Sequence, residues 1–302
     1  MAVIISMNLP TELKLTRKQK EILELIYKHR FLNRIQIQTF LKHKDYKTIN
    51  LWLKDLRNKH YLEWIYSTDF AEKTKPAIYY LGINGIRYLK TFNDEDYIQY
   101  PKSELSKRYK DPNRSKTYID RCVLLASCCL VLEKNPATRT LESETKPKWA
   151  ESVYFYETEA EYQQDSFYHF LLDNDCGIKP NLCFNELEYI GHDEPVTKHG
   201  YLLEIFDVTL PRYRLKKRLS NYVNYLDQEE ATWKEESLND HLPIILLVCS
   251  RLTDLIYAKR KTRGLIAELW ERDDEDRPHI RFTTANYLKA SDLLDKEIWE
   301  EA

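Results

Sequence analysis

The chain has 302 residues, of which 43% are hydrophobic and 31% are charged, a composition typical of a globular protein with one large domain or two of ordinary size. It holds only 6 glycines, and the close pair Gly82 and Gly85 is not followed by the Lys-Ser/Thr of a phosphate loop, so no nucleotide cofactor is expected. The longest apolar run, Leu242 to Cys249, is far shorter than the roughly 20 residues of a membrane span. The cysteines form no Cys-x-x-Cys pair, and we expect them to be reduced and buried in a cytoplasmic protein without a membrane partner.

The net charge of −2 hides an uneven distribution of charge along the chain. Residues 1–92 carry 17 basic and 8 acidic residues, a net charge of +9, whereas the other residues carry 29 basic and 40 acidic residues, a net charge of −11. A basic first third joined to an acidic body favours a module that binds a polyanion such as DNA. The alternative is a chance clustering of charges on a solvated surface.

The first module is expected to begin with three short helices. Thr16 starts a capping-box signature, and apolar residues at helical spacing predict a helix over residues 16–29. Asn33 is placed to cap a second helix that ends near Leu41. A third helix is predicted over residues 46–59, with one apolar and one polar face.

After the third helix the apolar period changes from 3.6 to 2. Residues 61–66 alternate like a strand, residues 67–76 form a polar connection, and residues 77–81 are predicted to be a returning strand. Three helices followed by a hairpin is the order of elements in a winged helix-turn-helix, whose third helix enters the major groove of double-stranded DNA. Some winged helices bind protein instead, so this order alone does not decide the partner.

The residues expected to contact DNA carry amide, hydroxyl or basic groups that can bind base edges and phosphates. They are Lys47, Thr48, Asn50, Lys54, Arg57 and Asn58 on the third helix, with Lys73 and Lys75 in the wing. Trp52 and Trp64 are interpreted as core residues rather than as platforms for base stacking.

A short helix over residues 84–92 is expected to close this first domain, which spans residues 1–92. Residues 93–116 are hydrophilic and contain six basic residues from Lys102 to Lys116, so we interpret them as a basic linker. The same segment could instead lie along a phosphate backbone.

Residues 117–302 are expected to form an α/β (α+β) domain, a mixed sheet with covering helices. Strands are predicted near residues 152–156, 179–184, 201–207, 243–249 and 281–284, a hairpin connection over 185–198, and helices over 117–133, 210–236 and 252–263. The uninterrupted apolar run of residues 243–249 is typical of a strand buried on both faces.

Several residues of this second domain follow a known pattern. A strand with Pro180 is followed by a strand with Glu204, and then by Leu215, Leu219 and Tyr222 on a helix. Together with the winged helix, over residues 15–260, this arrangement resembles the bacterial replication-relaxation family. The resemblance implies a protein of plasmids, integrative elements or phages, associated with plasmid replication and DNA relaxation, whose second domain has a restriction-endonuclease-like fold.

The chain departs from that family pattern at the acidic residues. An Asp is expected after the strand proline, where this chain has Asn181, and a second Asp is expected two residues after Glu204, where it has Phe206. Asp207 is displaced by one position, which turns it to the opposite face of the strand. A nuclease needs oxygen ligands that converge on Mg²⁺, so the second domain is interpreted as a degenerate nuclease fold.

Two roles are open for Glu204. It could serve a rearranged metal site with Asp207 and Asn181, or it could be a residue at the edge of the sheet paired with Arg212 or Arg214. In the first case the protein would be a Mg²⁺-dependent endonuclease or nickase. In the second case no metal and no other cofactor is expected.

A basic run begins the helix that follows Glu204, with Arg212, Arg214, Lys216, Lys217 and Arg218. Positive charges at a helix start oppose the helix dipole, so an anionic partner such as DNA phosphate would stabilise them. Neutralisation by carboxylates within the protein or across a dimer is the alternative.

The sequence therefore favours a sequence-specific, double-stranded DNA-binding protein of a mobile element, acting in replication, relaxation or transcriptional control. A homodimer on a two-fold site is expected, with a second domain that dimerises or contacts DNA or a partner. The alternative is a metal-dependent DNA-nicking enzyme that uses Glu204.

Overall fold

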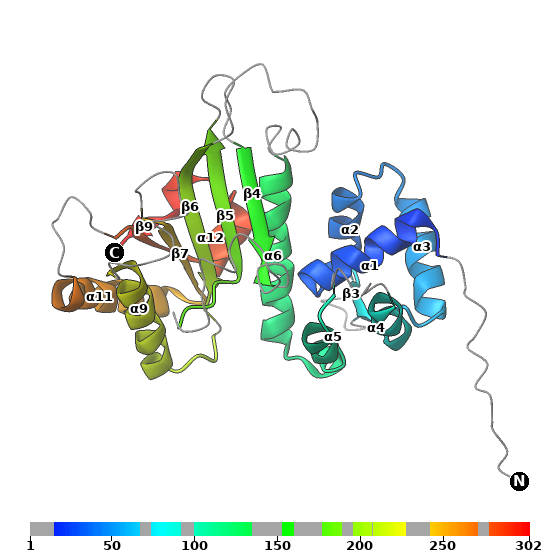
Figure 1. Ribbon diagram of the computed structural model, residues 1–302, viewed down its shortest axis with the longest axis horizontal. Helices are drawn as coiled ribbons and strands as arrows, with labels where there is room; N and C mark the ends of the chain where they lie inside the picture. The colour runs from blue at the N-terminus through cyan, green and yellow to red at the C-terminus, as the bar shows by residue number, and fades with distance from the viewer. Residues whose placement is uncertain are drawn as a thin grey trace, which may run out of the picture.

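The computed structural model describes residues 15–66, 74–91, 100–134, 153–159, 177–188, 196–206, 208–227, 242–270 and 278–302. It is a mixed α/β structure in two parts, an N-terminal group of helices with a small sheet and a larger sheet with helices on both faces (Figure 1). The helix α6 (Lys116–Lys134) stands between the two parts.

The N-terminal part has the predicted three helices, hairpin and closing helix, and in addition a short strand, Leu32–Asn33, between the first two helices that the sequence did not predict. Its elements are α1 (Arg17–His29), β1 (Leu32–Asn33), α2 (Arg34–Phe40), α3 (Tyr46–Asn58), β2 (Leu62–Ile65), β3 (Ile78–Leu81) and α4 (Ile83–Lys90). The strands form an antiparallel sheet in the order β1-β3-β2. The backbone carbonyls of His60 and Tyr61 leave no room for a Cβ at Gly82 and Gly85, so glycines are required where α4 begins.

Local capping residues fix where these helices begin. Thr16 and Gln19 form a complete capping box at α1, as predicted, and Asn33 forms a second capping box at α2. Asp45 caps α3 by accepting hydrogen bonds from two backbone amides of its first turn. The Gln19 amide also donates to the Asp55 carboxylate at 2.7 Å, which ties α1 to α3.

The segment predicted as a basic linker differs in part from that expectation. Residues 102–108 form a helix, α5 (Lys102–Arg108), and Asp111–Asn113 form a 3-10 turn. Leu105, Arg108 and Asp111 are buried, so this stretch packs against its neighbours rather than lying loosely in solvent. Residues 93–99 lie outside the described residues.

The second part contains a six-stranded sheet in the order β4-β5-β6-β7-β8-β9. Its elements are β4 (Val153–Thr158), β5 (Leu182–Glu188), β6 (Val196–Ile205), α9 (Arg212–Asp227), β7 (Ile244–Cys249), α11 (Leu252–Leu269), β8 (Ile280–Thr284), α12 (Ala285–Ala290), a 3-10 turn at Lys296–Ile298 and β9 (Glu300–Glu301). The pairs β6-β7 and β7-β8 are parallel and the others antiparallel, so the sheet is mixed, as predicted.

The buried strand β7 separates two hydrophobic cores. Ile245, Leu247 and Cys249 face α9 and α11, while the alternate residues face α6 and α12. Every residue of β7 is therefore buried, which confirms the prediction from its uninterrupted apolar run. The core on the α6 side continues without interruption into the N-terminal helices.

Several predicted boundaries change in the structure. Strand β5 runs to Glu188 and β6 starts at Val196, so both ends of the predicted connection over residues 185–198 belong to strands, and residues 189–195 lie outside the described residues. Helix α11 continues to Leu269, beyond its predicted end. The predicted continuation of α9 to residue 236 lies outside the described residues.

The described part of the chain shows the state of the cysteines and the character of its helices. The cysteines described there, at positions 122, 128, 129, 183 and 249, are buried and form no disulfide, as predicted. None of the described helices is long and apolar enough to cross a membrane.

Candidate nucleic-acid interface

The outer face of α3 presents a row of polar and basic side chains to solvent. Lys47, Asn50, Lys54 and Asn58 are exposed, and Leu51 lies among them with 66% of its surface accessible. The opposite face, formed by Ile49, Leu53 and Leu56, is buried in the N-terminal core. The apolar period of the sequence thus assigned the two faces of this helix correctly.

Two of the predicted contact residues on α3 have partners inside the protein. The hydroxyl of Thr48 donates to the Asp45 carboxylate at 2.6 Å, so its first role is in the helix cap. That hydrogen bond and those from the first-turn amides lower the pKa of Asp45. The Arg57 guanidinium lies over the ring of Trp64 at 4.0 Å from the ring centre.

Trp64 and Tyr66 form a stacked pair of exposed rings on the hairpin beside α3. Their ring centres are 5.6 Å apart with an interplanar angle of 16°, and the two side chains are 43% and 48% exposed. The prediction that Trp64 is a core residue is therefore wrong: Leu62 on β2 is buried, but Trp64, two residues further along the strand, is exposed. Trp52, by contrast, is partly buried against the core.

Two further residues extend this surface and were not singled out from the sequence. Arg34 begins α2 and its guanidinium lies 5.9 Å from the ring centre of Tyr46, the exposed first residue of α3. Arg34 belongs to another helix, so only its contact with Tyr46 brings it to the edge of α3. The sequence feature that could have indicated them is their place in the first turns of α2 and α3.

The predicted wing is described only in part. Lys75 is exposed just before β3, at the end of the hairpin connection. Lys73 lies outside the described residues. The contact of Arg57 with Trp64 therefore brings the Trp64–Tyr66 pair beside α3, and Lys75 is exposed on the same hairpin.

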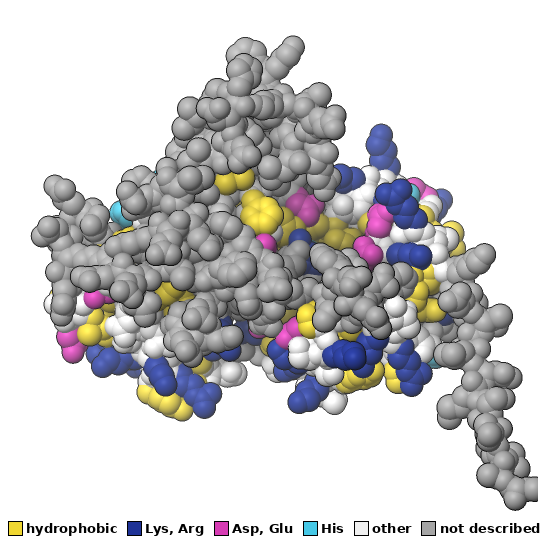
Figure 2. Space-filling model, viewed as in Figure 1, with side chains coloured by type: hydrophobic (Ala, Val, Ile, Leu, Met, Phe, Trp, Pro, Cys, Tyr) yellow, Lys and Arg dark blue, Asp and Glu magenta, His cyan; other side chains and the backbone are white. Residues whose placement is uncertain are grey.

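The predicted basic run lies on the first two turns of α9 and is exposed. Its members are Arg212, Arg214, Lys216, Lys217 and Arg218. Figure 2 shows Lys and Arg side chains gathered over α9, along the lower edge of the sheet domain in that view. Three of these residues contact neighbours: Arg212 lies over the ring of Tyr257, Arg214 bonds to the hydroxyl of Tyr213, and Arg218 pairs with Glu204.

Glu204 lies on β6 with its carboxylate almost completely buried under α9. Only 3% of the residue is exposed, and the carboxylate is ion-paired with Arg218 rather than with Arg212 or Arg214. Burial raises the pKa of Glu204, and the Arg218 charge opposes that rise. The carboxylate is therefore held by a side chain of the same domain.

The residues at the other positions of the expected acidic motif have structural roles where they are described. The side-chain oxygen of Asn181 accepts a hydrogen bond from the Ile205 amide at 2.9 Å, which fixes the start of β5 to β6. Phe206 is buried in the core under α9, and Asp207 lies outside the described residues. Among the described residues, no group of three or more His, Cys, Asp or Glu side chains could hold a metal ion.

Comparison with known proteins adds one finding about the chain. The family model described as Replication-relaxation matches residues 23–242, a span that begins in α1 and ends just before β7. Comparison with curated proteins and with solved structures gave no match.

Proposed function

The chain belongs to the replication-relaxation family, and from this premise we propose that it is a sequence-specific, double-stranded DNA-binding protein of a mobile element. In this proposal the N-terminal part is a winged helix-turn-helix, α3 is its recognition helix, and the β2-β3 hairpin is its wing. The role is in replication, DNA relaxation or transcriptional control.

The observation that carries the proposal is the outer face of α3. Lys47, Asn50, Lys54 and Asn58 are exposed along one side of a helix of 13 residues, and none of them forms an ion pair within the described part of the chain. Amide side chains can bind adenine in the major groove, and lysines can bind guanine or the flanking phosphates. A helix with this face is long enough to cross the groove.

The stacked Trp64–Tyr66 pair adds a second contact beside the recognition helix. With Arg57 held over one of the rings, the pair offers flat apolar surface and positive charge at the edge of the groove. Such a surface suits the sugars and phosphates that flank the bases read by α3. Lys73 and Lys75 extend the same contact along the wing.

We assign the second domain a non-catalytic role in a fold like that of the restriction endonucleases. The burial of Glu204 against Arg218 and the place of Phe206 in the core support this assignment. Arg212, Arg214, Lys216 and Lys217 would contact phosphates outside the site that α3 reads. Exposed apolar residues in the first turns of α9 and α11, such as Tyr213, Leu252 and Ile256, would serve a homodimer on a two-fold site.

Fluorescence anisotropy with duplex DNA from around the chain's own gene, against scrambled duplex, tests the proposal. We expect tighter binding to the native duplex, and we expect Lys54→Glu to weaken it by at least about tenfold because a carboxylate would face the DNA. The matched control is Lys289→Glu, an exposed lysine on α12 that should leave the affinity unchanged. Equal affinity of Lys54→Glu and the wild-type chain would remove α3 from the interface.

The same samples, incubated with Mg²⁺ and run on a denaturing gel, test the role of the second domain. The proposal predicts intact strands for the wild-type chain. Strand breaks that disappear in Glu204→Gln would overturn the non-catalytic assignment and make Glu204 part of a metal site.

A further inference from the structure

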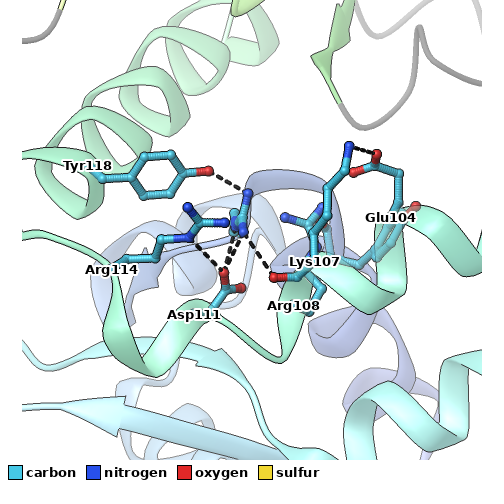
Figure 3. Close-up of polar contacts among 8 residues, drawn as sticks. Glu104, Lys107, Arg108, Asp111, Arg114 and Tyr118 are labelled. Atoms are coloured by element: carbon cyan, nitrogen blue, oxygen red, sulfur yellow. Dashed lines mark hydrogen bonds and ion pairs between the residues drawn. The ribbon is translucent and has the colours of Figure 1, made fainter. Parts of the chain in front are cut away.

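A cluster of charged side chains lies where the N-terminal helices, α5 and α6 meet. At its centre the Asp111 carboxylate is fully buried and is ion-paired with Arg30 at 2.6 Å, while Arg114 approaches it at 3.8 Å. Arg30 also donates to the Tyr118 hydroxyl and to the Lys107 carbonyl. Figure 3 shows Arg108, Asp111, Arg114 and Tyr118 converging on this centre.

Arg108 is the buried arginine of the cluster that forms no ion pair with a described carboxylate. Only 4% of the residue is exposed, and one of its terminal nitrogens donates to the Tyr27 carbonyl at 3.1 Å. Its Nε has no hydrogen-bond partner, and no carboxylate among the described residues forms an ion pair with it. Asp111 is paired with Arg30, and Glu104 is paired with Lys107.

A buried guanidinium without an ion pair is costly, because the more distant carboxylates replace only part of the hydration that burial removes. Burial and the neighbouring charge of Arg30 lower the pKa of Arg108, and the charges of Asp111 and Glu104 oppose that fall only in part. A native structure that retains such a group commonly supplies the missing acceptor from outside the chain, as an ion or a ligand.

A small cavity lies beside Arg108 and can hold such an acceptor. Its volume is about 70 Å³, and the basic residues in its wall are Lys28, Arg30, Lys107 and Arg108. The acidic residues of the wall are Glu104, already paired with Lys107, and Glu159. Since one water needs roughly 10–15 Å³ of such space, the cavity has room for an ion of about five heavy atoms.

We propose that this cavity is a binding site for a tetrahedral oxyanion of the phosphate class, held by Arg108 with Lys28, Arg30 and Lys107. The wall is shared by α1, α5, α6, the end of β4 and the residues that lead into β5. A bound anion therefore joins the N-terminal part to the sheet domain and stabilises their present arrangement. This site is separate from the face of α3 and does not depend on the DNA-binding proposal.

Thermal unfolding of the full chain with inorganic phosphate, against chloride at matched ionic strength, tests the site. We expect phosphate at about 10 mM to raise Tm by about 3 °C, as a ligand that binds only the folded state does. In Arg108→Met this rise should vanish while Tm without phosphate is equal to or above that of the wild-type chain, because a buried charge without an ion pair has been removed. The matched control Arg263→Met, at an exposed position on α11, should keep the full rise.

A second variant keeps the test decisive if Arg108→Met does not fold. The side chain of Lys107 is 51% exposed, so Lys107→Glu should fold and should abolish the rise in Tm by placing a carboxylate at the cavity. A phosphate-dependent rise of equal size in Lys107→Glu and the wild-type chain would overturn the proposal, as would no rise in the wild-type chain.

Competition with duplex DNA identifies the source of the oxyanion. If phosphate weakens DNA binding in the wild-type chain but not in Lys107→Glu, beyond the effect of ionic strength, the cavity takes a phosphate of the DNA backbone. If phosphate stabilises the chain and DNA binding is unaffected, the cavity takes the free ion. If chloride at the same ionic strength gives the same rise in Tm, the cavity binds neither a DNA phosphate nor free phosphate specifically.

Discussion

His29 is the last residue of α1, and its imidazole is buried against the ring of Phe40 with ring centres 4.5 Å apart. Its Nε2 has no hydrogen-bond partner in the described structure, so the ring packs as a neutral aromatic group. Burial and the adjacent Lys28 charge hold the pKa of His29 well below its usual value. The residue thus stabilises the fold only while it is uncharged.

This burial predicts how stability depends on pH. An unfolded histidine titrates at about 6.5, so as the pH falls the unfolded state binds the proton first and the folded state loses stability. We expect Tm to fall as the pH is lowered from 6.5 towards 5, and His29→Phe to reduce that fall. His279→Gln, at a histidine with 61% of its side chain exposed, is the control that should leave the profile unchanged. An identical profile for His29→Phe and the wild-type chain would show that His29 is not responsible.

Individual residues also show where the sequence was insufficient. The sequence offered Arg212 and Arg214 as partners of Glu204, yet the partner is Arg218, on the same side of α9 as the buried Leu215 and Leu219. The helical period identifies the buried side of α9. Which turn of α9 lies over Glu204 on β6 depends on how the helix packs on the sheet. Arg108 and Asp111 were interpreted as linker residues because charge in a sequence predicts exposure, and only the cluster around Asp111 explains their burial.

At the scale of elements, α3 and β2 together make the proposed interface. The helix was predictable because its cap, its apolar period and its polar face are all local signals. The exposure of the Trp64–Tyr66 pair was not predictable, because the period of a strand identifies which face a residue occupies but not how far the core extends beneath that face.

Different kinds of contact within this interface should respond differently to salt. If Lys54 binds a phosphate, Lys54→Gln should lower the slope of log affinity against log salt by about 1. Trp64→Ala should weaken binding by about fivefold to tenfold without changing that slope, because the ring contributes packing and cation–π contact rather than net charge. Anisotropy titrations at several salt concentrations measure both effects. A slope in Trp64→Ala that falls as much as in Lys54→Gln would show that the ring only positions Arg57.

At the scale of the whole molecule, one hydrophobic core joins the two parts. It extends from Ile22 and Leu53 through Leu124 on α6 to Leu246 on β7. Polar contacts strengthen the join, since the Gln36 amide donates to the Val123 carbonyl at 2.8 Å and to the Ser127 hydroxyl at 3.0 Å. The sequence predicted both sets of elements but not this continuity, because contacts between distant segments leave no periodic signal.

The continuous core predicts a single cooperative unfolding transition for the full chain. Parts that share a core lose their stability together, whereas parts joined by a linker unfold separately. Differential scanning calorimetry should therefore give one transition whose calorimetric and van't Hoff enthalpies agree. Two resolved transitions would show that the N-terminal part and the sheet domain are energetically independent.

The central claim is that the outer face of α3 binds duplex DNA, and site-specific photocrosslinking tests it most directly. Leu51 is 66% exposed in the middle of that face, and Tyr287 on α12 is 59% exposed and lies outside it. A photoreactive amino acid placed at position 51 should crosslink to duplex DNA from around the chain's own gene, and the same group at position 287 should not. Retained DNA binding without a crosslink from position 51 would contradict the account.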